Sequence, residues 1–178
     1  KGILDRFDQI KPKIIISVNG YYFKNKIFNI DDKIANILNK IPSIKHAVLV
    51  DYLESGINNK NYLSWDELLD NNSNDINFEQ LPFDYPLYIM YSSGTTGKPK
   101  SIVHSAGGTL IQHKKELKYH VGLDENDKIF YYTTCGWMMW NWLVSSLSIG
   151  ATVVLFEGSP FYPENNSLLK FMDGIDVN

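Results

Sequence analysis

Residues 91–100 read Tyr-Ser-Ser-Gly-Thr-Thr-Gly-Lys-Pro-Lys, and their side chains are suited to binding an anion. Two glycines, four Ser or Thr hydroxyls and two lysines fall within ten positions. Glycine lets successive backbone N–H groups turn toward one oxyanion, and the hydroxyls add short hydrogen-bond donors. The lysines supply positive charge. This segment is therefore predicted to be a phosphate-binding loop.

Two common phosphate-binding patterns do not fit the loop. When the NTPase pattern G-x-x-x-x-G-K-[ST] is placed on Gly97 and Lys98, Ser92 takes the first glycine position and Pro99 the magnesium-binding hydroxyl position. The dinucleotide pattern G-x-G-x-x-G does not occur in the sequence. A glycine-rich loop without a ligand is the remaining alternative, but the order of residue types favours phosphate.

A second segment, residues 133–144, places large apolar side chains directly after a glycine. It reads Thr-Thr-Cys-Gly-Trp-Met-Met-Trp-Asn-Trp-Leu-Val, with three tryptophans and two methionines in six consecutive positions. On a helix these residues point in several directions, so a buried aromatic helix explains most of them. Gly136, however, lies at a predicted strand-to-helix turn, where α/β sheets place ligands. Trp137, just beyond the turn, is suited to form one wall of a small pocket.

Alternating strands and helices are predicted to position these two segments. β-Branched and apolar runs predict strands at residues 14–18, 47–50, 102–103, 129–132 and 152–156, and a hairpin over residues 21–28. Apolar residues at helical spacing predict helices at residues 31–38, 105–121, 137–147 and from 168. The alternation predicts an α/β fold made of parallel-sheet subdomains with flanking helices.

Two helix ends are predicted in more detail. Ser64 and Glu67 form a capping box that should begin a short helix within an otherwise polar stretch. Ser105 should cap the helix over residues 105–121, and Gly122 should end it. The face of that helix expected to pack inward consists of Ala106, Leu110, Leu117 and Val121.

The composition is that of a globular chain with one core and no basic excess. The 178 residues are 44% hydrophobic and 21% charged, with a formal net charge of −3. This balance gives no indication of a nucleic-acid partner, and the longest apolar run, residues 143–156, is too short to span a bilayer. The single cysteine, Cys135, excludes an internal disulfide. A cytoplasmic protein is expected.

Several other residues able to do chemistry have simpler explanations. His104 follows a strand, where a structural role is as good an explanation as a phosphate contact. His113, Glu116 and His120 fall on one side of a predicted helix but lack a fourth ligand, so no metal site is assigned. Cys135 has no histidine or acid placed by sequence to activate it and is expected to be a small buried residue.

The loop resembles, from Ser92 to Lys100, the phosphate-binding signature of acyl-adenylate-forming enzymes, the superfamily that includes acyl-CoA synthetases, luciferases and peptide adenylation domains. One departure is Ser101, where many members have glycine. The resemblance implies that the loop holds the β- and γ-phosphates of Mg-ATP while a carboxylate attacks the α-phosphorus. It makes Lys100 a catalytic residue and Lys98 a loop charge. The triphosphate contacts that it implies are Ser93, Gly94, Thr95, Thr96, Gly97 and Lys100.

The second segment narrows the resemblance to the short-chain acyl-CoA synthetases, whose Gly-Trp pair lies beside the acyl site. Gly136, Trp137 and Met138 are therefore the acyl-pocket candidates. Residues 6–13, 102–108, 133–144 and 155–160 are similar to the branch that activates acetoacetate. This resemblance implies an ATP-dependent ligase that joins acetoacetate to coenzyme A through an acyl-AMP intermediate, with Mg²⁺. A ligase for acetate or propionate is the alternative.

The resemblance also implies a domain assignment. Residues 1–178 are expected to be part of the large N-terminal adenylation domain, without the C-terminal domain. The adenine-, ribose- and magnesium-binding segments and the catalytic lysine of the C-terminal domain are expected after Asn178, so the fragment alone should be inactive. A separate phosphate-binding module and a non-catalytic remnant are the competing explanations.

Overall fold

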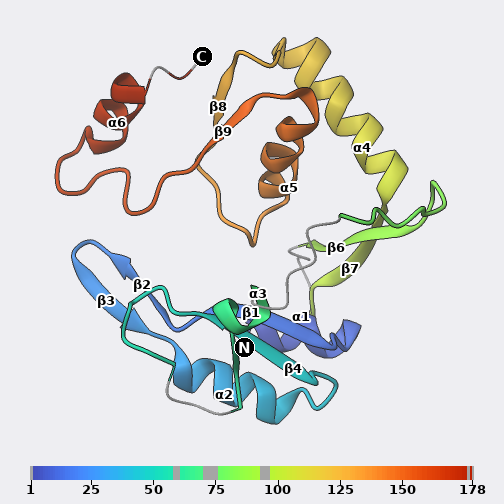
Figure 1. The fold of residues 1–178 in the computed structure, drawn as a ribbon, viewed down its shortest axis with the longest axis vertical. Coiled ribbons are helices and arrows are strands. Elements are labelled where there is room, and N and C mark those ends of the chain that lie inside the picture. The colour runs from blue at the N-terminus through green and yellow to red at the C-terminus, as the bar shows by residue number, and fades with distance from the viewer. Residues whose placement is uncertain (1, 58–60, 70–75, 93–96, 176, 178) are drawn as a thin grey trace. The chain divides into compact units, whose positions relative to one another are not determined.

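The computed structural model describes residues 2–57, 61–69, 76–92, 97–175 and 177, and the chain divides into two compact units. Unit 1 comprises Lys1–Glu79 and Tyr91–Ser101, and unit 2 comprises Gln80–Met90 and Ile102–Asn178. Figure 1 shows strands and helices alternating along the chain. The strands β6 (Pro86–Ser92) and β7 (Lys100–Ser105), which pair with each other on either side of the glycine-rich loop, contribute residues to both units.

Unit 1 is built on a three-stranded parallel sheet with the strand order β1-β4-β5. The strands are β1 (Ile14–Val18), β4 (His46–Val50) and β5 (Leu63–Ser64), and the helices are α1 (Gly2–Ile10), α2 (Asp31–Lys40) and α3 (Trp65–Leu69). Its core consists of Ile34, Ala47, Leu49 and Tyr62. The strands at 14–18 and 47–50 and the helix from 31 are confirmed, whereas α1 had no counterpart among the predicted elements.

The predicted hairpin is formed by β2 (Gly20–Phe23) and β3 (Lys26–Asn29), which pair antiparallel. Its two turn residues, Lys24 and Asn25, have φ angles of 49° and 60°. This left-handed conformation at both central positions matches the right-handed twist of the flanking strands. The two-residue turn therefore fixes the register that pairs Gly20 with Asn29.

The capping box at the start of α3 is confirmed by both of its hydrogen bonds. The backbone N–H of Glu67 donates to Ser64 Oγ at 3.1 Å, and the backbone N–H of Ser64 donates to Glu67 Oε2 at 2.8 Å. Hydrogen bonds to the Glu67 carboxyl, first from the Ser64 backbone and then from the Ser64 side chain, hold the pKa of that carboxyl below its usual value. The box makes a five-residue helix begin at a defined residue.

Unit 2 contains a parallel pair, β8 (Lys128–Phe130) and β9 (Thr152–Val154), together with its helices. The helix α4 (Ala106–Lys115) continues into a π-helical turn, η1 (Glu116–Val121), and α5 (Met138–Val144) continues into a 3₁₀ turn, η2 (Ser145–Ile149). The last helix is α6 (Ser167–Ile175). Leu117, Leu123, Ile129 and Leu143 form the core. The predicted α/β class, with parallel strands and flanking helices, is confirmed.

The predicted inward face of the helix over residues 105–121 is confirmed at Leu117, which is fully buried, but wrong at Leu110 and Val121. Leu110 and Val121 are 46% and 49% exposed, while the buried side chains are Thr109, His113 and Leu117. Two polar residues replace the expected apolar ones because His113 has a hydrogen-bonding partner, Ser145, on the neighbouring η2 turn. Ser105 makes no capping hydrogen bond with its side chain, whereas Gly122, at φ 84°, ends the helix as predicted.

Among the described residues, no helix combines the length and the apolar character needed to cross a membrane.

Candidate functional site

Within the glycine-rich segment 91–100, the structure describes Tyr91, Ser92 and residues 97–100. Ser93, Gly94, Thr95 and Thr96 lie outside the described residues. Gly97 has a φ of 102°, a backbone conformation that residues other than glycine rarely adopt. Lys100 begins β7 with an exposed side chain and makes no ion pair with any described residue. Gly97 and Lys100 therefore have the backbone freedom and the charge that an anion site requires.

Lys98 lies in a different setting from Lys100. It lines a small cavity of about 320 Å³ in unit 1 together with Asp5 and Asp8 of α1 and with Lys40. The cavity therefore holds two carboxylates and two ammonium groups, so the charge of Lys98 lies near opposite charges of its own unit. The role of Lys98 as a loop charge stays a prediction.

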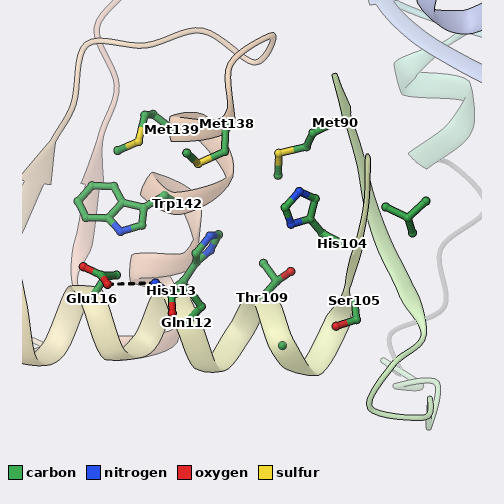
Figure 2. Close-up of a pocket in the computed structure, with 12 residues that line it drawn as sticks. Met90, His104, Ser105, Thr109, Gln112, His113, Glu116, Met138, Met139 and Trp142 are labelled. Atoms are coloured by element: carbon green, nitrogen blue, oxygen red, sulfur yellow. Dashed lines mark hydrogen bonds between the residues drawn. The ribbon is translucent and has the colours of Figure 1, made fainter. Parts of the chain in front are cut away.

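Unit 2 contains a larger open pocket of about 720 Å³, within the range of small-molecule sites (Figure 2). Its walls come from three places in the chain. β6 and β7 supply Met90, Val103, His104 and Ser105. α4 and η1 supply Gly108, Thr109, Gln112, His113 and Glu116, and α5 supplies Met138, Met139 and Trp142. Figure 2 shows the side chains of His104 and His113 between the methionines on one side and α4 on the other.

Met90, in one wall of the pocket, is hydrogen-bonded to a residue of α5. The Asn141 side-chain amide donates to the Met90 thioether sulfur at 3.8 Å. A thioether is a weak acceptor, so this contact orients the methionine more than it stabilises the fold. It links the strand before the glycine-rich loop to the helix that follows Gly136 and Trp137.

His113 is held in one tautomer by its neighbours. Its Nδ1 lies 2.8 Å from Ser145 Oγ, and that hydroxyl donates its single hydrogen to the carbonyl oxygen of Asn141, also at 2.8 Å. Because the serine hydrogen is already used, His113 Nδ1 must carry the hydrogen and donate it. Nε2 is then an acceptor. Burial, with a smaller effect of His104, lowers the pKa of His113, which favours the neutral ring.

The polar residues near the bottom of this pocket are paired with one another. Gln112 Nε2 donates to Glu116 Oε1 at 3.0 Å, and Glu116 Oε2 lies 3.1 Å from His120 Nδ1. The Lys115 ammonium, 2.9 Å from Glu116 Oε1, is the largest cause of the lowered pKa of that carboxyl. In the part of the chain that the structure describes, no three His, Cys, Asp or Glu side chains are grouped to hold a metal ion.

The three acyl-pocket candidates differ in where the structure places them. Met138 lines the pocket. Gly136 lies in the turn between β8 and α5, and the next residue, Trp137, donates its backbone N–H to Thr134 at 3.0 Å while its side chain is 71% exposed. Cys135, expected to be buried, is exposed.

Most of the pocket lining was not predicted from the sequence, in particular Met90, Thr109, Met139 and Trp142. One signal was present, because Thr109 and His113 are four residues apart and therefore share a helix face. A helix face predicted from the spacing of apolar residues does not include such polar pairs. The resulting pocket combines apolar thioether and aromatic walls with a few polar groups, which suits a small polar organic molecule.

Comparison with known proteins gives consistent matches over this chain. Residues 3–178 match the family described as AMP-binding enzyme. The acetoacetyl-coenzyme A synthetase of Rhizobium meliloti (strain 1021) is 44% identical over 179 residues, which cover 96% of this chain and 27% of that protein. The malonamoyl-CoA synthetase vrtB of Penicillium aethiopicum is 40% identical over 171 residues, 90% of this chain and 24% of that protein.

A solved structure, acetoacetyl-CoA synthetase from Streptomyces lividans, matches with a TM-score of 0.94 and 38% sequence identity. The match covers 99% of this chain and 27% of that chain. This chain therefore has the fold of the corresponding part of that structure, and it spans about a quarter of the length of the proteins that it matches.

Proposed function

Since the chain belongs to the family of AMP-binding enzymes, we propose that it is part of an ATP-dependent ligase that forms acetoacetyl-CoA. One observation carries the proposal. The Rhizobium meliloti and Streptomyces lividans proteins, both named as acetoacetyl-CoA synthetases, match 96% and 99% of this chain. The proposal applies to the complete protein, because the match covers 27% of each of these relatives.

The proposed reaction has two steps. A carboxylate oxygen of the acid attacks the α-phosphorus of ATP, the bond to the β-phosphate bridging oxygen breaks, and pyrophosphate leaves. The sulfur of coenzyme A, having lost its proton to solvent, then attacks the acyl carbon, and AMP leaves with the bridging oxygen. Adenylation makes the second step feasible because AMP is a far better leaving group than hydroxide.

We assign the triphosphate to Ser93, Gly94, Thr95, Thr96, Gly97 and Lys100. Two observations support this assignment: the left-handed backbone of Gly97, and the ammonium of Lys100, which has no ion-pair partner among the described residues. Pyrophosphate carries developing negative charge as it leaves, and preorganised donors and a cation stabilise that charge most where it forms. Lys100 is the residue to which we give a catalytic role.

Mg²⁺ would accompany ATP and neutralise part of its phosphate charge. No residue of this chain is assigned to Mg²⁺ or to the coenzyme A contacts. The proposed partners are small molecules, namely ATP, coenzyme A and a short-chain acid. We also propose a cytoplasmic location, on the grounds of the charge balance and single cysteine noted above.

We place the acid beside Gly136, Trp137 and Met138, with the pocket of Figure 2 adjoining at Met138. Acetoacetate and malonamate, the acids implied by the names of the two relatives, share a carbonyl group that one methylene carbon separates from the carboxylate. Thr109, which is 8% exposed, lines this pocket, and its hydroxyl can donate to such an oxygen. The substrate class that the pocket supports is therefore a short acid with a β-carbonyl group.

Acid-dependent exchange of pyrophosphate into ATP by the complete protein tests this function. We compare acetoacetate, malonamate, acetate, propionate and butyrate, and expect acetoacetate to support the fastest exchange. Exchange with acetate but not with acetoacetate would instead show a short-chain ligase of the acetyl or propionyl type. No exchange with any acid would favour the non-catalytic alternative.

A further inference from the structure

The helix α1 contacts the chain on both sides of the glycine-rich loop. Before the loop, the Tyr91 hydroxyl donates to the backbone oxygen of Arg6 at 2.8 Å, and the Arg6 guanidinium lies 5.8 Å from the centroid of the Tyr91 ring. After the loop, Gln9 Nε2 donates to the carbonyl oxygen of Pro99 at 2.9 Å. These residues all belong to unit 1 and are separated by about ninety positions in sequence.

Gln9 is oriented by its own helix before it contacts the loop. The same Nε2 donates to the carbonyl oxygen of Asp5, one turn earlier in α1, at 2.7 Å. An amide nitrogen has two hydrogens, so both bonds can form together. The second hydrogen is thereby aimed at Pro99 without the entropy cost of fixing a free side chain.

A hydrogen bond to the Pro99 carbonyl also constrains the backbone of the next residue, Lys100. It belongs to the peptide unit that joins Pro99 to Lys100, and a peptide unit is planar, so fixing its oxygen also fixes the direction of the Lys100 N–H. Proline has a fixed φ, which leaves fewer ways for the backbone to relax at this point. The Gln9 bond therefore sets how the chain enters β7 at Lys100.

We propose that Gln9 is a positioning residue that orients Lys100 toward the phosphates of ATP by holding the Pro99 carbonyl. The inference rests on the proposed function, because it requires that Lys100 bind the triphosphate. Gln9 itself contacts no substrate. Its effect is on ATP binding and on the adenylation step, and the thioester-forming step, which uses acyl-AMP and coenzyme A, does not depend on it.

The substitution Gln9→Met in the complete protein removes the donor and keeps the length of the side chain. Because Gln9 is exposed, the variant is expected to fold, and its thermal midpoint is recorded as a check. We expect the dissociation constant of ATP, measured by calorimetry without acid, and the KM for ATP in pyrophosphate exchange to rise about tenfold, the loss typical of one hydrogen bond. Thioester formation from supplied acyl-AMP and coenzyme A should keep its wild-type rate.

Three variants accompany this test. Lys100→Met should show the same pattern with a larger loss of adenylation, since it removes the charge itself. Gln9→Lys keeps an N–H donor and should recover most of the ATP affinity. Lys45→Met is the matched control, because it removes a side-chain bond of 3.0 Å to another proline carbonyl, that of Pro42, and should leave ATP binding unchanged.

Each result decides the inference. Equal losses in both half-reactions, or unchanged ATP affinity in Gln9→Met, would show that Gln9 only supports the fold or has no role. If the wild-type protein binds ATP but exchanges pyrophosphate with none of the acids, the proposed substrate is wrong. The ATP dissociation constants of the variants still test the role of Gln9 in that case. A wild-type protein that does not bind ATP would overturn both proposals.

Discussion

At the level of single residues, the pocket of unit 2 shows how a polar side chain acquires a defined state on folding. His113 is 7% exposed and donates to Ser145, whose own hydrogen goes to the carbonyl oxygen of Asn141. Two consequences follow: the ring presents Nε2 as an acceptor, and its protonation is disfavoured. Neither consequence can be read from the letter His in the sequence.

The lowered pKa of His113 predicts a pH dependence of stability. Below about pH 6.5, the usual value for histidine, the unfolded chain takes up a proton that folded His113 resists. The unfolded state then binds more protons, so the free energy of unfolding falls as pH decreases from about 7 toward the folded pKa. Denaturant unfolding at several pH values measures this slope.

In His113→Asn the slope between pH 7 and pH 5 should be smaller, and stability at pH 7 should drop by about 1 kcal/mol from the lost bond to Ser145. His46→Asn, at an exposed position, controls for removing an imidazole and should retain the wild-type slope. An unchanged slope in His113→Asn would contradict the assignment of this effect to His113.

At the level of elements, close packing decides which glycines are required. Gly20 is buried at the start of β2, where an added Cβ would lie 2.6 Å from the backbone oxygen of Phe28 on the paired strand β3. A backbone atom within a hairpin cannot move aside without breaking the strand pairing. Gly174, in α6, would place a Cβ in open space. The same substitution should therefore have opposite effects at these two positions.

We expect Gly20→Ala to reduce the free energy of unfolding by about 1–3 kcal/mol, the usual cost of overpacking. Gly174→Ala should increase the stability of its helix by about 0.5–1 kcal/mol, because alanine loses less backbone entropy than glycine. Thermal or urea unfolding of both variants measures the difference. A neutral or stabilising Gly20→Ala would mean that β2 and β3 separate without cost.

At the level of the whole molecule, the chain matches 27% of the Streptomyces lividans structure, although the match covers 99% of the chain itself. Unit 1 carries the ends of the glycine-rich loop and unit 2 carries the pocket of Figure 2, and each is proposed above as a ligand site. Adenylation also requires adenine and ribose contacts, which the superfamily resemblance assigns to other segments. Activity is therefore expected of the complete protein.

The purified 178-residue chain, supplied with ATP, Mg²⁺, acetoacetate and coenzyme A, should form no thioester, whereas the complete protein should. Positioning of all reactants accounts for a large share of catalysis, and a partial site loses it. Mass spectrometry of the coenzyme A pool is the measurement. Turnover by the chain alone would show that residues 1–178 hold the whole reacting set.

The sequence by itself determined the family, the hairpin, the capping box of Ser64 and Glu67 and most strands, because each depends on residues close together in the chain. It missed α1 and the contact of Gln9 with Pro99, and it chose the wrong face of α4. Tertiary structure decided these features, because a polar side chain such as His113 is buried only where a distant partner satisfies it, and that partner is brought there by folding. Local pattern thus determines what an element is, and packing determines which of its side chains form the site.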